Sequence, residues 1–221
     1  KLSVEDAQQL GVVLRSNRSI DTIIMEKCEI SCKAAIKLAD GLRDNKTLRT
    51  VNLWDNNIGC IGATSLADAL KYNGTLSTLN LWGNNVGDDG ATAFADVLRV
   101  NNTLQTLILV YNNVGDDGGD ELVDALELNS GIRNLDLFGN PVDQGIVTEI
   151  YGMISNPRSR SYYGGGLNKN DDGGGDELGI EVTVDTTGKG CCLGGEESPT
   201  GVDEMAGCCW TSSVDVVTDE F

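Results

Sequence analysis

The sequence predicts an α/β solenoid, in which a short strand and a helix alternate and each unit buries its apolar side against its neighbours. A pattern of residues recurs every 28 positions, marked by Ile20, Leu48, Leu76, Leu104 and Ile132. The first half of each unit alternates apolar and polar residues, as a half-buried strand does, and the second half has the apolar spacing of a helix. A fixed period of this length is typical of repeat proteins, whose core lies between the repeats.

Each unit opens with the predicted strand, whose inward residues are Leu48, Val51 and Leu53 in the second repeat, with apolar equivalents in the later repeats. An asparagine stands eight residues after each leading apolar residue, except in the first repeat, where Cys28 takes its place. An amide side chain offers both donors and an acceptor. We therefore expect a structural ladder at the turns that follow the strands, formed by Asn56, Asn84, Asn112 and Asn140.

The predicted helix follows, as in Ala63, Leu66, Ala67 and Leu70. Asp89 and Asp117 are expected to cap helix starts. The paired carboxylates at 88–89 and 116–117 also suggest calcium, but capping and solvation explain them at lower cost. A second asparagine series should end the helices in left-handed backbone geometry; its members are Asn45, Asn73, Asn101 and Asn129. Extended backwards, the pattern gives a half-repeat and five repeats over residues 1–157.

The strand, asparagine and helix positions together resemble leucine-rich repeats of the ribonuclease-inhibitor subtype. The resemblance covers residues 1–157 and implies a horseshoe with a parallel sheet on the concave face and helices on the convex face. Similar proteins include ribonuclease inhibitor, the sensing regions of NOD-like receptors and the Ran GTPase-activating protein. Because nearly all of them act by binding other proteins, the resemblance implies a protein-interaction module or scaffold.

In such a fold the polar-phase strand residues project from the concave sheet. Trp54 and Trp82 stand one repeat apart, so we expect them side by side, about 5 Å apart. Exposed aromatic side chains are typical of binding hot spots; the alternative is that they only cover one another or pack on a further element. The predicted partner-binding residues are Glu26, Asn52, Trp54, Asn80, Trp82, Val110, Tyr111, Asp136 and Phe138.

Composition argues against several classes of function. The net charge of −18 argues against a nucleic-acid partner, because neutralising phosphates needs a basic surface. The chain contains no histidine, which removes the commonest general base, and it has no nucleotide-binding or nucleophile motif. We therefore expect a non-enzymatic, monomeric binder of another protein, with no catalytic residue, cofactor or metal. The alternatives are a GTPase activator of the Ran-directed type, or a fragment of a larger NOD-like receptor-type regulatory protein.

From residue 158 the periodicity stops. Residues 158–221 are rich in glycine and acidic side chains, so we expect a mostly disordered tail. The tail holds two cysteine pairs, Cys191–Cys192 and Cys208–Cys209, which lack the spacing of a zinc site. Cys28, Cys32 and Cys60 are expected to be small buried apolar residues. This cysteine usage, and the absence of a transmembrane segment or secretory signal, indicate a cytoplasmic protein.

Overall fold

The computed structural model describes residues 1–155, in which helices and strands alternate along the chain. The predicted α/β alternation is therefore confirmed, whereas the predicted tail lies outside the described residues. The elements are α1 (Val4–Ser16), β1 (Thr22–Ile24), α2 (Cys32–Asp44), β2 (Thr50–Asn52), α3 (Gly59–Leu70), β3 (Thr78–Asn80), α4 (Gly87–Leu98), β4 (Thr106–Ile108), α5 (Asp116–Leu128), β5 (Asn134–Asp136) and α6 (Gln144–Ser155).

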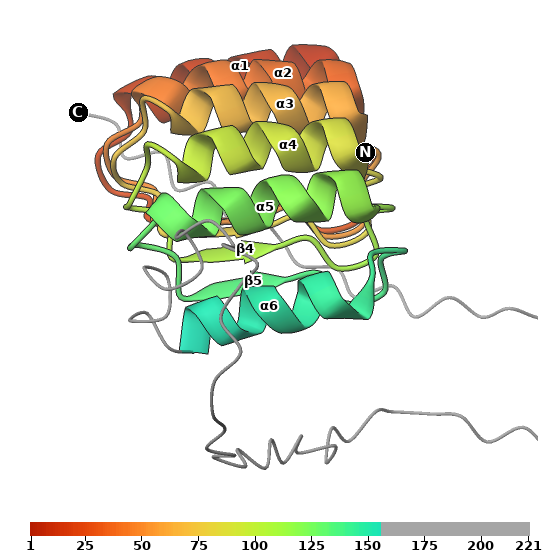
Figure 1. The fold of residues 1–221 in the computed structure, drawn as a ribbon. Helices are drawn as coiled ribbons and strands as arrows, with labels where there is room; N and C mark the ends of the chain where they lie inside the picture. The colour runs from red at the N-terminus through yellow and green to blue at the C-terminus, as the bar shows by residue number, and fades with distance from the viewer. Residues whose placement is uncertain (156–221) are drawn as a thin grey trace, which may run out of the picture. The chain divides into compact units, whose positions relative to one another are not determined.

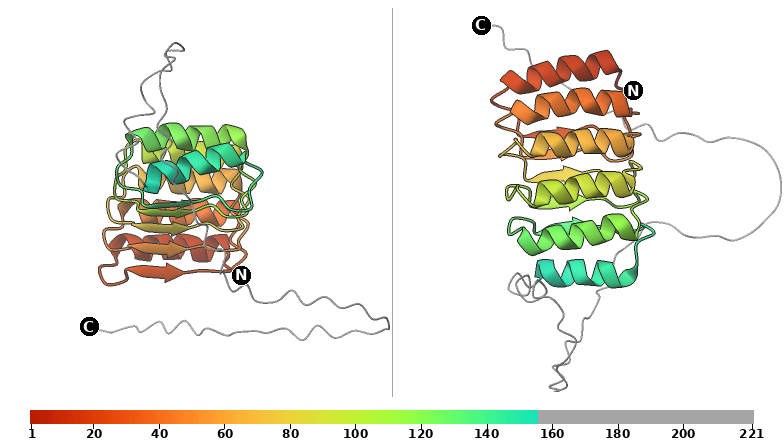
Figure 2. Two further views of the ribbon diagram at one scale, coloured as in Figure 1. Left: turned by 60° about the horizontal axis from the view of Figure 1, so that its bottom comes forward. Right: turned by 45° about the horizontal axis from the view of Figure 1, so that its top comes forward.

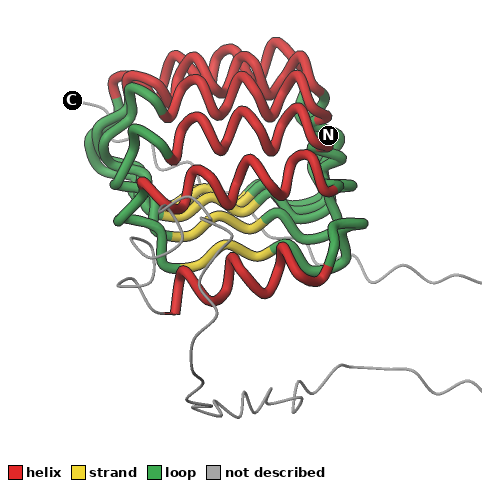
Figure 3. The backbone as a smooth tube through the Cα atoms, in the orientation of Figure 1, coloured by secondary structure: helices red, strands yellow, loops and turns green. Residues whose placement is uncertain are grey.

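The five strands form one parallel sheet in the order β1-β2-β3-β4-β5. Neighbouring strands pair in a register of one repeat, so that Thr50 lies opposite Thr22 on one side and Thr78 on the other. The helices form a second layer over one face of this sheet (Figures 1 and 3). They lie side by side in chain order (Figure 2). None of the helices in residues 1–155 covers the other face of the sheet (Figure 2), which we call the open face of the sheet.

The core lies between the two layers. From the second repeat onward the three inward residues of each strand segment are buried, as in Leu76, Leu79 and Leu81. Each repeat therefore contributes a row of apolar side chains that is covered by the rows before and after it. Ile20, the equivalent residue in the first repeat, is 41% exposed because β1 is the edge strand.

The second asparagine series differs from its prediction. The backbone of Asn45 and Asn129 is extended, with φ of −67° and −84°, and none of the four residues has a positive φ. The side chains instead turn inward and join repeats. Asn73 Nδ2 donates to the carbonyl of Leu42, at 2.7 Å, and its Oδ1 accepts from the backbone N–H of Leu76, at 2.8 Å. These buried residues thus form a second ladder instead of left-handed helix ends.

The helix caps also differ from their prediction, because no side chain of α4 or α5 caps its own helix. Asp88 Oδ1 instead accepts from the N–H groups of Gly115 and Gly118 at the start of α5, at 2.6 and 3.2 Å. Gly118 leaves room for this contact, because a Cβ there would lie 2.7 Å from the Asp88 oxygen. The carboxylate therefore caps the next repeat's helix.

Replacing Asp88 with alanine should lower the free energy of unfolding by about 1 kcal/mol, since it leaves two N–H groups at the start of α5 without their acceptor. Asp88→Asn keeps an oxygen acceptor and should lose less. Asp89→Ala is the matched control, because its side chain has no cap bond and offers only a dipole interaction of about 0.5 kcal/mol. Urea denaturation followed by circular dichroism measures all three, and equal losses for Asp88→Ala and Asp89→Ala would contradict the inter-repeat cap.

The cysteines of the described region are Cys28, Cys32 and Cys60. They are free thiols, and each is half-buried instead of fully buried as predicted. Within residues 1–155 no helix combines the length and the apolar character needed to cross a bilayer.

Candidate functional site

Four aromatic side chains form a row across the strand ends. We call Trp54, Trp82, Tyr111 and Phe138 the aromatic column. Successive ring centroids lie 5.8, 6.0 and 5.7 Å apart, and the last pair meets edge to face. Exposure rises along the row, from the half-buried Trp54 to Trp82 at 39%, Tyr111 at 53% and Phe138 at 66%. Adjacent repeats therefore place one ring each beside the next, and the rings of Trp82, Tyr111 and Phe138 are exposed.

The fourth repeat departs from the predicted column. Val110, which stands at the position of Trp54 and Trp82, is only 3% exposed. Tyr111 takes its place from the next position along the chain, where the backbone is left-handed with φ of 50°. The prediction that Val110 is an exposed member of the column was thus wrong. Tyr111, which was predicted to lie beside the column, lies within it.

Tyr111 can join the row because of a glycine in the following repeat. Gly139 has a φ of 73°, and a Cβ on it would overlap the Tyr111 ring, lying 2.9 Å from Cζ. Without that Cβ the ring lies against the backbone of Gly139 and reaches Phe138. Gly139 therefore provides both the turn and the space that close the aromatic column.

Side chains of the strands hold the column residues in place. Asn52 Oδ1 accepts from the backbone N–H of Trp54, and Asp136 Oδ1 accepts from that of Phe138, each at 3.0 Å. Asn80 makes the equivalent bond to Trp82, also at 3.0 Å. These predicted partner-binding residues thus lie at the column, and each fixes the backbone of an aromatic residue two positions later.

The first asparagine series bonds to the backbone that carries the rings. Asn56 Nδ2 donates to the carbonyl of Trp54 at 3.2 Å, and Asn84 Nδ2 donates to that of Trp82 at 3.1 Å. Asn112 does the same at Val110, also at 3.1 Å. Asn140 continues the series to the carbonyls of Leu109 and Leu137, both at 2.8 Å.

Charges surround the column unevenly. The Lys27 ammonium lies 4.7 Å from the centre of the Trp54 ring, where the π-face attracts a cation. Glu26 of the first repeat accepts from the Asn52 amide, and Asp55 follows Trp54 in the second repeat. A third carboxylate, Asp136, lies at the other end of the column, in β5 beside Phe138. The sequence prediction omitted Lys27 and Asp55, although both occupy the repeat position of Tyr111, directly after the column position.

Tyr151 of α6 adds no charge to this surface. Burial, together with the charge of Asp136, raises the pKa of the Tyr151 phenol. The phenol is therefore neutral at physiological pH and adds no second negative charge beside Asp136.

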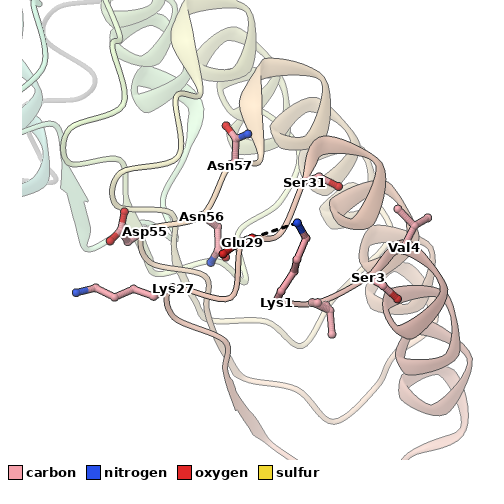
Figure 4. A pocket seen from close by; sticks show the side chains of 10 residues that line it. Lys1, Ser3, Val4, Lys27, Glu29, Ser31, Asp55, Asn56 and Asn57 are labelled. Carbon is pink, nitrogen blue, oxygen red and sulfur yellow. Dashed lines mark ion pairs between the residues drawn. The ribbon is translucent and has the colours of Figure 1, made fainter. Parts of the chain in front are cut away.

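A hollow of about 730 Å³ lies beside the Trp54 end of the column, at the first repeat (Figure 4). Lys1 and Glu29 form an ion pair across it at 3.2 Å, which is exposed and therefore worth little. Ser3 and Ser31 in its wall are helix caps. Among the described residues no cluster of histidine, cysteine or carboxylate side chains is arranged to hold a metal ion.

Comparison with known families identifies the repeats. A family model described as "Leucine Rich repeat" matches residues 44–67, 72–95 and 100–123, and each match spans one strand and part of the helix that follows it. The chain carries leucine-rich repeats. No curated protein matches the chain.

Solved structures support the same fold. The structure titled "Leiomodin-1 Actin-Binding Site 2 (ABS2)" aligns with a TM-score of 0.59 and 17% identity, over 73% of this chain and 93% of that one. The tropomodulin C-terminal domain of Caenorhabditis elegans aligns with a TM-score of 0.60 and 13% identity, over 73% and 96%. At these identities the similarity shows a shared fold.

Proposed function

We propose that the chain is a non-enzymatic protein-interaction module that binds another protein on the open face of its sheet, the predicted concave face. The aromatic column carries this proposal. Exposed aromatic rings that adjoin one another bury a large apolar area on binding, at a low cost in side-chain entropy. Contiguous apolar surface of this kind on a repeat protein favours a partner-binding site.

The comparisons support an interaction role and name one candidate. The leiomodin-1 structure is titled as an actin-binding site. The low identity does not transfer that ligand to this chain, so actin enters the proposal only as one protein to be tested. The ribonuclease-inhibitor subtype, a monomeric state and a cytoplasmic location belong to the same proposal.

Exchanging Trp54 and Trp82 for alanine together should lower partner capture at least about tenfold, because the exchange removes half of the rings in the column. The experiment is affinity capture from a cell extract, with purified actin as a separate arm and bound protein quantified. Tyr72→Ala is the matched control, since Tyr72 is an exposed aromatic residue that stacks with Arg43, away from the column. Helical circular dichroism and thermal melting of the double variant should match the parent.

Undiminished capture by the double variant would overturn this assignment, because binding would then lie elsewhere. Loss of fold in the double variant would show that Trp54 and Trp82 are structural and would leave the location of the site to a second variant. Phe138→Ala separates the two cases, because Phe138 is the most exposed ring and contributes least to packing. A capture defect in that folded variant would still locate the site on the column.

A GTPase-activating function of the Ran-directed type is the alternative. Stimulated GTP hydrolysis across a panel of small GTPases separates it from the binding module, because a module without this activity leaves every hydrolysis rate at its basal value. If the chain is instead a piece of a NOD-like receptor-type protein, the coding sequence before Lys1 should contain further repeats or a nucleotide-binding domain.

A further inference from the structure

The spacing of the aromatic column discriminates between the backbone shapes that could lie along it. Its rings recur at 5.7–6.0 Å. An α-helix presents one side chain per turn, about every 5.4 Å. An extended strand presents same-face side chains about every 6.7 Å, and a polyproline helix repeats about every 9.3 Å. Over the three intervals between the four rings, the side-chain spacing of a helix differs from the ring spacing by about 1.3 Å in total, and that of a strand differs by about twice as much.

The charge around the column sets the chemistry that complements it. Glu26, Asp55 and Asp136 supply three carboxylates, and the ammonium group of Lys27 lies over the Trp54 ring. The exposed Arg49 and Arg133 stand one residue before β2 and β5, at the opposite end of the strands from the column. This surface therefore favours a cationic partner. The chain's own residues 158–221 hold 13 acidic and 4 basic side chains, so their charge has the wrong sign for this surface.

We propose that the aromatic column binds a cationic amphipathic α-helix of a partner protein, which lies along the row and across the strands. This inference rests on the proposed function, whose binding surface it shares. One apolar side chain of each of four successive turns contacts one ring, in an i, i+4, i+7, i+11 pattern. Lysine or arginine residues beside that stripe face Glu26, Asp55 and Asp136.

The test uses three synthetic peptides of about 18 residues, roughly five helical turns. The first is a lactam-stapled helix with leucine in the i, i+4, i+7, i+11 pattern and lysine beside it. The second has the same composition, with leucine and lysine in strict alternation so that one face of an extended strand is apolar. The third is the first helix with glutamate in place of lysine. Each carries a fluorescent label, and binding to the full chain is measured by anisotropy in about 0.15 M salt.

The cationic helix should bind at least about tenfold more tightly than either comparison peptide. It should lose that advantage on the Trp54→Ala and Trp82→Ala double variant but keep it on Tyr72→Ala. Equal or tighter binding of the alternating peptide would overturn the helical occupant, and equal binding of the acidic helix would overturn the cationic one. Binding that survives the double variant would also overturn the inference, since the peptide would then sit elsewhere.

The two proposals fail separately. If none of the peptides binds while the double variant still loses partner capture, the column is a binding site and the helical occupant is wrong. If capture is unaffected by the double variant, the proposed function itself is wrong, whatever the peptides do.

Discussion

Replacing Asn112 with alanine is expected to lower the free energy of unfolding by about 2–6 kcal/mol. The Asn112 side chain is fully buried, and its Oδ1 accepts from the backbone N–H groups of Asn84 and Val86, at 2.9 and 3.2 Å. Alanine leaves both donors unpaired in the interior, and each such group costs about 1–3 kcal/mol. The carbonyls that the amide also contacts keep other donors, since Leu81 O accepts from Asn84 Nδ2 and Val110 O from Gly83 N–H.

The same exchange at Asn84 should cost clearly less, about 1 kcal/mol. Asn84 is equally buried, but its Oδ1 is the one buried side-chain oxygen in residues 1–155 that has no hydrogen-bond partner. Its amide donates to the carbonyls of Leu53, Leu81 and Trp82. All three retain a second donor, from Asn56, Asn112 and Asp55 respectively, so alanine leaves no backbone group unpaired.

Urea denaturation of the two single variants measures this difference directly, because the exchange is identical and both sites are buried. Asn112→Ala should have the lower midpoint. Equal midpoints would mean that the contribution of each asparagine to stability does not depend on how many backbone N–H groups donate to its side-chain oxygen. A lower midpoint for Asn84→Ala would mean that its amide donor bonds matter more than the acceptor bonds of Asn112.

The fold was predictable because its strongest signal is periodic. Leu48, Leu76 and Leu104 recur at one spacing, and both their burial and the strand register follow that spacing. The alternation of strand and helix follows from the change in apolar period within each unit. The single parallel sheet then follows because units of equal length stack in register.

The contacts between repeats were less predictable, because local rules describe a residue within its own element. Asp88 is one of a pair of carboxylates at the start of α4, yet it caps α5, whose N-cap residue lies 27 residues later. Asn45 stands where an asparagine often ends a helix, yet its amide reaches the carbonyl of Leu14, 31 residues earlier. Both side chains are used across the repeat boundary, where the stacking of neighbours decides the partner.

The candidate site shows the same limit. Trp54, Trp82 and Phe138 project as the strand alternation predicts. Val110 at the same repeat position is buried, and Tyr111 from the next position places its ring in the row, against Gly139. Nothing in the spacing of the fourth repeat predicts that Tyr111 takes the place of Val110 in the row. The replacement depends on the absence of a Cβ at Gly139, in the fifth repeat.

Shortening Phe94 to alanine is expected to lower the free energy of unfolding by about 3–5 kcal/mol. Phe94 lies in α4 and is the largest of the fully buried side chains in residues 1–155. The equivalent position holds leucine in the helices on either side, Leu66 in α3 and Leu122 in α5. Phe94→Leu should therefore cost only about 1–2 kcal/mol, since the site accommodates a leucine in neighbouring units and retains most of its volume.

Thermal or urea denaturation of both variants tests this expectation, and binding of the cationic helix adds a second reading. α4 packs against both α3 and α5, so a cavity there weakens both repeat interfaces of the central unit that carries Trp82. Phe94→Ala should therefore weaken peptide binding at temperatures where Phe94→Leu binds normally. Equal destabilisation by leucine and alanine would mean that the shape of the aromatic ring, instead of the volume it fills, holds the centre of the solenoid together.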